Sequence, residues 1–396
     1  MLGSPSKPLQ SGSEQSRLST SAAQPVKVAI LFSNYGPYHF ARVNDFHQRC
    51  EQVGMSCVAI ELARSEATYA WVSEVATPYP FVSVIPDRQL EQVRTSELVK
   101  RVFATLNQVN PSVIAIAGYG IPGMIAAGVW AMLHRKPMVL LSASKEDDAS
   151  RSQWKERVKG WFVNRYDAAL VGGQPQKRYL VKLGMSPDRV FTGYNVVGND
   201  AFAPEKIRSL PRPIERPFFL AVNRFVPRKN LVRLISAYAA YREQVCDRAW
   251  DLVLCGEGSA QAEIEAHIRD YDLEAVVHLP GFLQQAELLP YLAHAECFVH
   301  TSLQEQWGLV INEAMAAGLP VIVSNRCGCY EDLIVEGETG LGFDPEDTEA
   351  LTRCLVRLSS SDYRAMGEAG LRRIQKFSPA YFAEGLDQAV QCALAK

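Results

Sequence analysis

The sequence predicts two α/β domains, each built on a doubly wound parallel sheet. Two patterns support this prediction: apolar runs of strand length alternate with helical segments from Val26 onward, and glycine turns follow several of the runs. A strand, a glycine turn, a helix and a second strand form the opening unit of such a sheet. Length is a third observation, because 396 residues are too many for one core and suit two domains.

The first domain is expected over residues 26–198. Its opening unit is an apolar strand at 26–33, a turn, a helix at 40–54 and a second strand at 55–62. The further strands are expected at 81–86, 112–120, 137–144 and 168–173, and the further helices at 96–110, 121–133, 151–166 and 178–183. Residues 189–192 are expected to end the domain.

The same alternation begins again after a proline-containing stretch at 199–216, which is interpreted as a linker. The second domain is expected over 217–377. The strands of this domain are expected at 218–225, 250–259, 275–282, 297–300 and 320–324, and its helices at 231–241, 260–269, 287–295, 309–317 and 346–373. A last segment at 378–396 is expected to contain one more helix, at 380–395.

Composition excludes several classes of protein. The formal net charge of −2 argues against nucleic-acid binding, which needs a basic surface. Nine scattered cysteines favour a reducing cytoplasm over a disulfide framework, and Cys327-Gly-Cys329 lacks the second ligand pair of a zinc site. No apolar run is long enough to span a membrane. Residues 1–25 contain seven serines and no apolar signal-peptide core, which predicts a disordered tail.

The most informative stretch lies between the strands at 297–300 and 320–324. Gly308 stands where the chain enters a helix, so the backbone N–H groups of Gly308, Leu309 and Val310 can point at an anion. Glu305 precedes this helix and Glu313 lies one turn inside it. Two carboxylates beside a phosphate site are explained if they hold hydroxyl groups, as on a sugar and a ribose.

Residues 305–322, Glu-Gln-Trp-Gly-Leu-Val-Ile-Asn-Glu-Ala-Met-Ala-Ala-Gly-Leu-Pro-Val-Ile, resemble the E-x7-E signature of retaining glycosyltransferases of the family-4 type, the glycosyl transferases group 1. The resemblance extends over roughly the C-terminal half. It implies the GT-B fold, with two Rossmann-like domains, a cleft between them, and a last helix that crosses back onto the first domain. It also implies a hexosyltransferase that moves a sugar from a nucleotide-diphosphate sugar to an acceptor hydroxyl with retention.

The resemblance also implies roles for single residues. Arg224 and Lys229 match the Arg and Lys-Asn pattern that neutralises the donor diphosphate, and Glu305 would bind the sugar hydroxyls and steady an oxocarbenium-like transition state. These three are the expected catalytic residues. The expected donor-binding residues, with Glu313 on the ribose and the three at 281–283 on the base, are Gly36, Gly256, Gly281, Phe282, Leu283, Gly308, Leu309, Val310 and Glu313.

The acceptor is expected at the carboxyl ends of the first domain's strands, where such sheets bind ligands. The candidate residues there are His39, Tyr119, Ser144 and Lys145. For His39 a solvent-facing loop position is an equally good interpretation. The expected partners are a UDP- or GDP-sugar and a sugar, lipid-linked or small-molecule acceptor, without nucleic acid.

No cofactor or metal is expected. Asp270-Tyr271-Asp272 has the spacing of a metal-binding D-x-D motif, but it closes a helix and is interpreted as a polar turn. Cationic side chains would replace the metal.

The helix expected at 151–166 is basic and amphipathic, with Trp154, Val158, Trp161 and Phe162 on one stripe. Packing of the stripe on the sheet is the expectation, because a strand follows at once. The alternative is peripheral contact with an anionic membrane, which would place a cytoplasmic protein at the inner membrane surface.

Two other functions are compatible with the sequence. A sugar-nucleotide 2-epimerase shares the two-domain architecture but needs further acid and base residues at the site. A non-catalytic sugar-nucleotide-binding scaffold would keep its cellular role after Glu305 or Lys229 is replaced by alanine.

Overall fold

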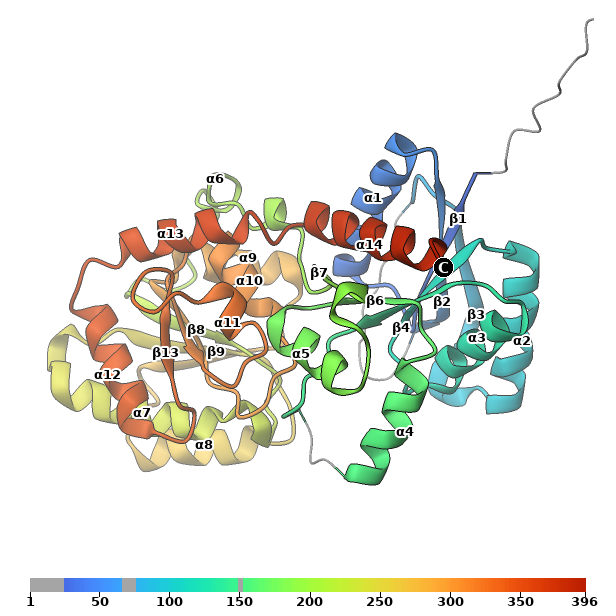
Figure 1. Cartoon of the computed structure of the whole chain (residues 1–396). Helices are drawn as coiled ribbons and strands as arrows, with labels where there is room; N and C mark the ends of the chain where they lie inside the picture. The colour runs from blue at the N-terminus through green and yellow to red at the C-terminus, as the bar shows by residue number, and fades with distance from the viewer. Residues whose placement is uncertain (1–24, 66–75, 149–151) are drawn as a thin grey trace, which may run out of the picture.

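The computed structural model describes residues 25–65, 76–148 and 152–396, which form two lobes with one parallel sheet each (Figure 1). The first sheet has seven strands in the order β3-β2-β1-β4-β5-β6-β7, and the second has six in the order β10-β9-β8-β11-β12-β13. All strand pairs are parallel. The predicted α/β class with two doubly wound sheets is therefore confirmed. The tail predicted at 1–25 lies outside the described residues, apart from Pro25.

The first lobe places its apolar strands between two helical layers, which is why the strands are apolar runs without alternation. Helices α2 to α5 cover one face of the sheet, and α1 covers the other together with α14, the last helix of the chain. The strands are β1 Lys27–Phe32, β2 Ser56–Ser65, β3 Phe81–Gln89, β4 Val113–Ala117, β5 Met138–Ser142, β6 Ala168–Val171 and β7 Val190–Thr192. The helices are α1 Pro37–Gln52, α2 Thr95–Val109, α3 Pro122–Leu133, α4 Gln153–Val163 and α5 Gln174–Lys182.

The second lobe repeats this arrangement. Helices α7, α8 and α12 pack on one face of its sheet, and α9, α10, α11 and α13 on the other. The strands are β8 Phe218–Val222, β9 Asp251–Cys255, β10 Val277–Gly281, β11 Cys297–His300, β12 Val321–Ser324 and β13 Leu341–Phe343. The helices are α6 Pro204–Ile207, α7 Leu231–Val245, α8 Gln261–Asp270, α9 Gln285–His294, α10 Leu309–Ala316, α11 Tyr330–Leu333, α12 Thr348–Ser359 and α13 Arg364–Ile374. The last helix, α14 Pro379–Leu394, packs on the first lobe.

Several expected elements differ from the observed ones. The helical region expected at 346–373 is two helices, because Ser361 and Asp362 bond locally to the backbone of Arg357 and Arg364 and so compete with helix continuation. The stretch expected to be a linker contains α6, which packs on the second lobe. The short elements α11 and β13 were not predicted, since three or four residues carry too little periodicity.

Helix α4 contradicts the expectation that its apolar stripe packs on the sheet. Trp154, Val158 and Trp161 are 71%, 48% and 59% exposed, and only Phe162 of that stripe packs against the core. The helix is held at its C-terminal end, where Val163 is fully buried. The rest of α4 therefore extends below the first lobe in Figure 1 with its apolar stripe facing outward.

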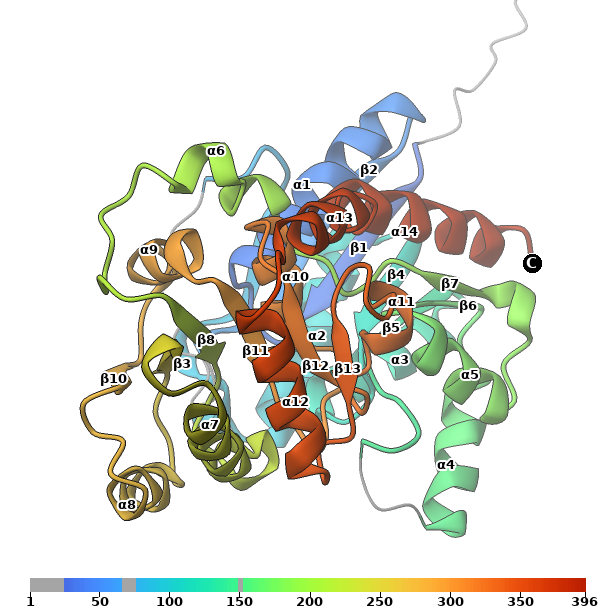
Figure 2. The ribbon, with the colours of Figure 1, turned by 90° about the vertical axis from the view of Figure 1, so that its left-hand side faces the viewer.

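The fold brings the carboxyl ends of both sheets to the region between the lobes. Strand order reverses between β1 and β4 in the first sheet and between β8 and β11 in the second, and such switch points are where open α/β sheets bind ligands. Helix α14 runs from the second lobe back onto the first, where Asp387 pairs with Arg49 at 2.8 Å (Figure 2).

Candidate functional site

Two loops leave the second sheet at its switch point and lie against each other. The loop after β8 carries Arg224 and Lys229, and the loop after β11 carries Glu305 and leads into α10. The Thr301 hydroxyl donates to the carbonyl oxygen of Lys229 at 2.8 Å, and the Leu303 N–H donates to that of Arg228 at 2.9 Å. These bonds fix the two loops relative to each other.

Lys229 and Glu305 form an ion pair between these loops. The Lys229 ammonium donates to Glu305 Oε2, which also accepts from the Ser302 hydroxyl at 3.4 Å and lies 3.3 Å from His300 Nε2. Burial alone would raise the pKa of Glu305. The hydrogen bond from His300 and the charge of Lys229 outweigh burial and hold this pKa well below its usual range. Glu305 is therefore a carboxylate at neutral pH.

His300 supports this carboxylate from behind, and sequence reasoning missed it. Its side chain is fully buried at the end of β11, and burial lowers its pKa, so the imidazole is neutral at pH 7. Its Nδ1 has no hydrogen-bond partner within the described ranges. His300 could have been predicted as a site residue, because it is a polar residue that ends an apolar strand at a switch point of the sheet.

The start of α10 lies beside the ion pair. Gly308 has a φ of +102° as the residue that caps the helix, and a Cβ there would lie 3.5 Å from Glu305 Cγ. In the described part of the chain, the N–H groups of Gly308, Leu309 and Val310 donate to no protein acceptor. A cation, a carboxylate and three available donors therefore share one corner of the lobe.

Glu313 lies further along α10 and is 4% exposed. Burial raises its pKa to about 7, although a hydrogen bond from Tyr38 partly opposes the shift. This short bond, from the Tyr38 hydroxyl to Glu313 Oε1, joins the first helix of one lobe to the second lobe. Tyr38 was not predicted as a site residue.

The remaining donor-binding candidates are spread along the edges of both sheets. The Gly256 N–H donates to the Gly281 carbonyl oxygen at 2.8 Å, and a Cβ at Gly256 would lie 1.8 Å from the Asn223 carbonyl oxygen, so close packing of two loops demands glycine there. Phe282 is 53% exposed and Leu283 is half-buried.

Two further candidates differ in what their polar groups contact. Arg224 is exposed and makes no ion pair or side-chain hydrogen bond with the described residues. Gly36 caps α1, and its N–H donates to His39 Nδ1 at 3.1 Å. That N–H is therefore already bonded, while the Arg224 guanidinium is available to a ligand.

The acceptor candidates lie at the carboxyl edge of the first sheet, and the structure engages several in protein contacts. His39 stands in the first turn of α1 with its ring 4.3 Å from that of Phe32, so the interpretation as a solvent-facing loop histidine is wrong. Burial and the nearby Arg42 lower its pKa to about 3. The Tyr119 ring lies 6.0 Å from that of Phe162.

Ser144 and Lys145 follow β5. The Ser144 N–H donates to the Ser142 hydroxyl at 3.3 Å. Lys145 is 4% exposed, and its ammonium donates to the Arg326 carbonyl oxygen at 2.7 Å and pairs with Asp147 at 2.7 Å. Lys145 is therefore a contact between the lobes.

Other contacts close the two lobes on each other near Glu305. The Trp307 indole is 2% exposed, donates to Asn312 Oδ1 at 2.9 Å, and lies against Gly173 of the first lobe. The Gln176 amide donates to the Gln306 carbonyl oxygen at 2.5 Å. Helices α5 and α11 lie side by side here in both views (Figures 1 and 2).

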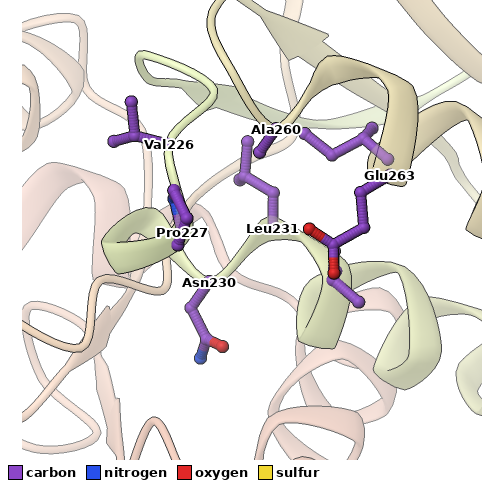
Figure 3. Close-up of a pocket in the computed structure, with 8 residues that line it drawn as sticks. Val226, Pro227, Asn230, Leu231, Ala260 and Glu263 are labelled. Atoms are coloured by element: carbon purple, nitrogen blue, oxygen red, sulfur yellow. The ribbon is translucent and has the colours of Figure 1, made fainter.

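A small pocket of about 180 Å³ lies at the start of α7, on the loop that carries Lys229 (Figure 3). Val226, Pro227, Leu231 and Ala260 line it together with Asn230 and Glu263. None of the predicted site residues lines this pocket. In the described ranges, no group of three or more His, Cys, Asp or Glu side chains could hold a metal ion, and no helix is long and apolar enough to cross a membrane.

Comparisons with known proteins show which family and fold this chain resembles. The family model for glycosyl transferases group 1 matches residues 202–373. The uncharacterized glycosyltransferase YqgM of Bacillus subtilis is 31% identical over 180 residues, which cover 46% of this chain and 48% of that protein. The D-inositol 3-phosphate glycosyltransferase of Corynebacterium glutamicum is 28% identical over 276 residues, 66% of each chain. The chain thus spans between about half and two thirds of these two relatives.

The likeness in structure extends over almost the whole chain. The crystal structure of Anabaena HepE in complex with UDP and glucose superposes with a TM-score of 0.73 at 19% identity, covering 92% of this chain and 99% of that one. The sucrose-phosphate synthase of Thermosynechococcus elongatus gives 0.71 at 21% identity, with 93% and 99% covered. At such identities the likeness shows the fold, which is GT-B.

Proposed function

We propose that this chain, whose residues 202–373 match the family model for glycosyl transferases group 1, transfers a sugar from a nucleotide-diphosphate sugar to an acceptor hydroxyl, with retention at the anomeric carbon. The observation that carries the proposal is the corner formed by Lys229, Glu305 and the three N–H groups at the start of α10.

The donor diphosphate would bind at this corner and gain negative charge as the glycosidic bond breaks. The end of a helix contributes about 0.3–1 kcal/mol to holding an anion, and up to about 2 when partly buried. A preorganised donor aimed at developing charge contributes about 3–4 kcal/mol. Lys229 and the exposed Arg224 would therefore supply more of the stabilisation than the helix, and in this proposal they replace a metal ion.

Glu305 would face the transferred sugar. A diphosphate competes with Glu305 for the Lys229 ammonium, so donor binding would release the carboxylate from its ion pair. The carboxylate can then accept hydrogen bonds from the sugar hydroxyls and stabilise positive charge at the anomeric carbon. Because His300 and Ser302 still hold Oε2, the carboxylate would keep its position.

The nucleoside would extend along α10 and the edge of the second sheet. Ribose hydroxyls can donate to Glu313 in place of the Tyr38 hydroxyl, and the backbone at 281–283 can contact the base. The acceptor would enter from the edge of the first sheet, and closure of the lobes would exclude water that otherwise hydrolyses the donor.

Thermal unfolding with UDP-, GDP- and ADP-glucose tests donor binding, because a ligand at 100 times its Kd stabilises the folded state by about 2.7 kcal/mol. We expect the UDP- or GDP-sugar to raise the melting temperature of the wild type and to have much less effect on the Lys229→Ala variant. If none of the three raises the melting temperature, the proposed donor class is wrong.

The product then tests the reaction. NMR of the linkage formed from an α-linked donor should show an α-linked product, and the rate should survive EDTA. Release of nucleoside diphosphate without any sugar on an acceptor would instead indicate hydrolysis or epimerase-like chemistry.

A further inference from the structure

The first lobe has an apolar surface over α3 and α4 that the proposed transfer does not use. Among the described residues, ten large apolar side chains are exposed, and seven of them belong to these two helices. Ile125, Val129 and Leu133 recur at four-residue spacing along one side of α3, and Trp154, Val158 and Trp161 form the stripe of α4. We call these six residues the α3–α4 patch.

The two halves of the patch are neighbours. A Cβ on Gly128 of α3 would lie 3.8 Å from the Phe162 ring of α4, and the centre of that ring lies 6.0 Å from the centre of the Tyr119 ring, in the loop before α3. Val158 and Trp161 lie within one turn of Phe162. The exposed stripes therefore belong to two helices that meet at Gly128 and Phe162.

Positive charge surrounds this surface. Four basic residues and one acid occur between 153 and 165. Lys155, Arg157 and Arg165 are exposed, and the Arg165 guanidinium lies 4.6 Å from the centre of the Trp161 ring. The single acid, Glu156, is held by Lys159 at 3.0 Å and by the Tyr179 hydroxyl at 2.7 Å, on the inner side of α4. The outward side of α4 is therefore both aromatic and cationic.

We propose that the α3–α4 patch docks the first lobe on an anionic lipid bilayer. Tryptophans flanked by lysine and arginine suit the boundary between headgroups and acyl chains, where the rings are buried and the cations meet lipid phosphates. A second copy of the chain fits less well, because a symmetric interface on this patch would set Lys155 and Arg157 against their own copies.

Docking would also orient the site. Helix α4 begins where the loop after β5 ends, and that loop carries Ser144 and Lys145 at the carboxyl edge of the first sheet. Trp154, at the N-terminal end of α4, follows that loop in the sequence. This part of the inference rests on the proposed function, and it identifies the acceptor class as a hydroxyl on a membrane lipid.

Co-sedimentation of the full chain with phosphatidylcholine vesicles, with and without phosphatidylglycerol, tests the docking. We expect binding that requires phosphatidylglycerol and weakens with salt. The Lys155→Gln/Arg157→Gln variant should bind about 25-fold more weakly, since each cation near an anionic surface contributes about a factor of five. The Trp154→Ser/Trp161→Ser variant should lose binding, because it removes the two indole rings that would insert into the bilayer.

Matched controls lie on the second lobe. Tyr271 is 46% exposed, and Arg353 and Arg372 are exposed on α12 and α13, so Tyr271→Ser and Arg353→Gln/Arg372→Gln should bind vesicles like the wild type. The proposal is overturned if the wild type does not sediment with anionic vesicles, or if both patch variants sediment as well as the controls do.

A second measurement distinguishes membrane docking from self-association through the patch. If analytical ultracentrifugation shows a dimer that the tryptophan variant abolishes, while no vesicle binding occurs, the patch is a self-association surface and the proposal is wrong. Donor binding by thermal unfolding needs no vesicles. A failure there would refute the proposed function and leave the vesicle result unchanged.

Discussion

The two lobes have the same topology, yet their switch-point edges differ in what their polar groups contact. At the second lobe's edge, Lys229, Glu305 and Gly308 come together and leave backbone donors and the Arg224 side chain available. At the first lobe's edge, the Gly36 N–H is taken by His39, and Lys145 is taken by Arg326 of the opposite lobe. The same fold therefore forms a charged ligand corner in one lobe. In the other lobe, the polar groups at the corresponding edge are bonded to the protein itself.

The ligand chemistry explains this difference. A diphosphate is always a dianion or more and must meet fixed cations and N–H groups, which a motif of set spacing can supply. An acceptor hydroxyl is neutral and needs only one or two hydrogen bonds. The residues that provide them can differ from one edge to another, while buried polar groups left over must bond to the protein itself.

The strongest test of the contrast is the Lys229→Ala variant. It removes the cation that neutralises the leaving group, and we expect kcat/KM for the nucleotide sugar to fall about 100- to 1000-fold, as when a preorganised donor is removed from a site of developing charge. Steady-state kinetics with the donor identified by thermal unfolding would measure it.

Arg228 offers the matched control for this variant. It is exposed and adjacent to Lys229 on the same turn. Arg228→Ala should change kcat/KM by less than about threefold, in line with the weak effect of exposed charges. Equal losses in the two variants would mean that the loop attracts the donor only through its net positive charge. The specific contact proposed between Lys229 and the diphosphate would then be wrong.

The second test uses Glu313, which accepts a hydrogen bond from the Tyr38 hydroxyl of the other lobe. Its pKa in the folded protein is about 7, against an ordinary value of 4.5. A carboxyl with a raised pKa stabilises the folded state fully below pH 4.5, and this stabilisation is lost as the pH rises to about 7. The wild type should therefore lose up to about 3 kcal/mol of unfolding free energy across this window.

Urea unfolding between pH 4.5 and 8 would measure this loss. Glu313→Gln should flatten the profile, because glutamine does not ionise, whereas Glu349→Gln, at a side chain 91% exposed, should leave it unchanged. An unchanged slope in Glu313→Gln would show that this carboxyl is ionised at low pH and that burial has not raised its pKa.

Nucleotide binding by the wild type should depend on pH in the opposite direction from its stability. A carboxylate accepts ribose hydroxyls better than a carboxylic acid does, so the wild type should bind its nucleotide more tightly as the pH rises from 6 to 8. Binding by Glu313→Gln should not depend on pH in this range. Calorimetric titration at the two pH values measures the difference.

The contrast between the lobes also explains how much could be predicted from the sequence. Apolar runs and glycine turns were sufficient for the longer strands of both sheets, since parallel strands are apolar on both faces, but the three-residue strand β13 was missed. Motif spacing and the family resemblance singled out Lys229 and Glu305, but not the ion pair that they form with each other. His300 and Tyr38 were missed, because their contacts depend on how two loops, or two lobes, meet in space. The stripe of α4 was misplaced because periodicity identifies an apolar face and not what covers it.

The smallest expected effect concerns Lys145, which was predicted to contact the acceptor and which the structure places between the lobes. Lys145→Met would remove a charged donor to the Arg326 carbonyl oxygen, and hydrogen bonds to charged groups contribute about 1.5–3 kcal/mol. We expect a loss of about 2 kcal/mol in urea unfolding, with the KM for acceptor changed less than threefold. Lys182→Met, which removes an exposed ion pair with Glu146, should cost less than about 1 kcal/mol. A rise in acceptor KM with unchanged stability would instead return Lys145 to the acceptor site, and the two switch-point edges would then be more alike than their contacts indicate.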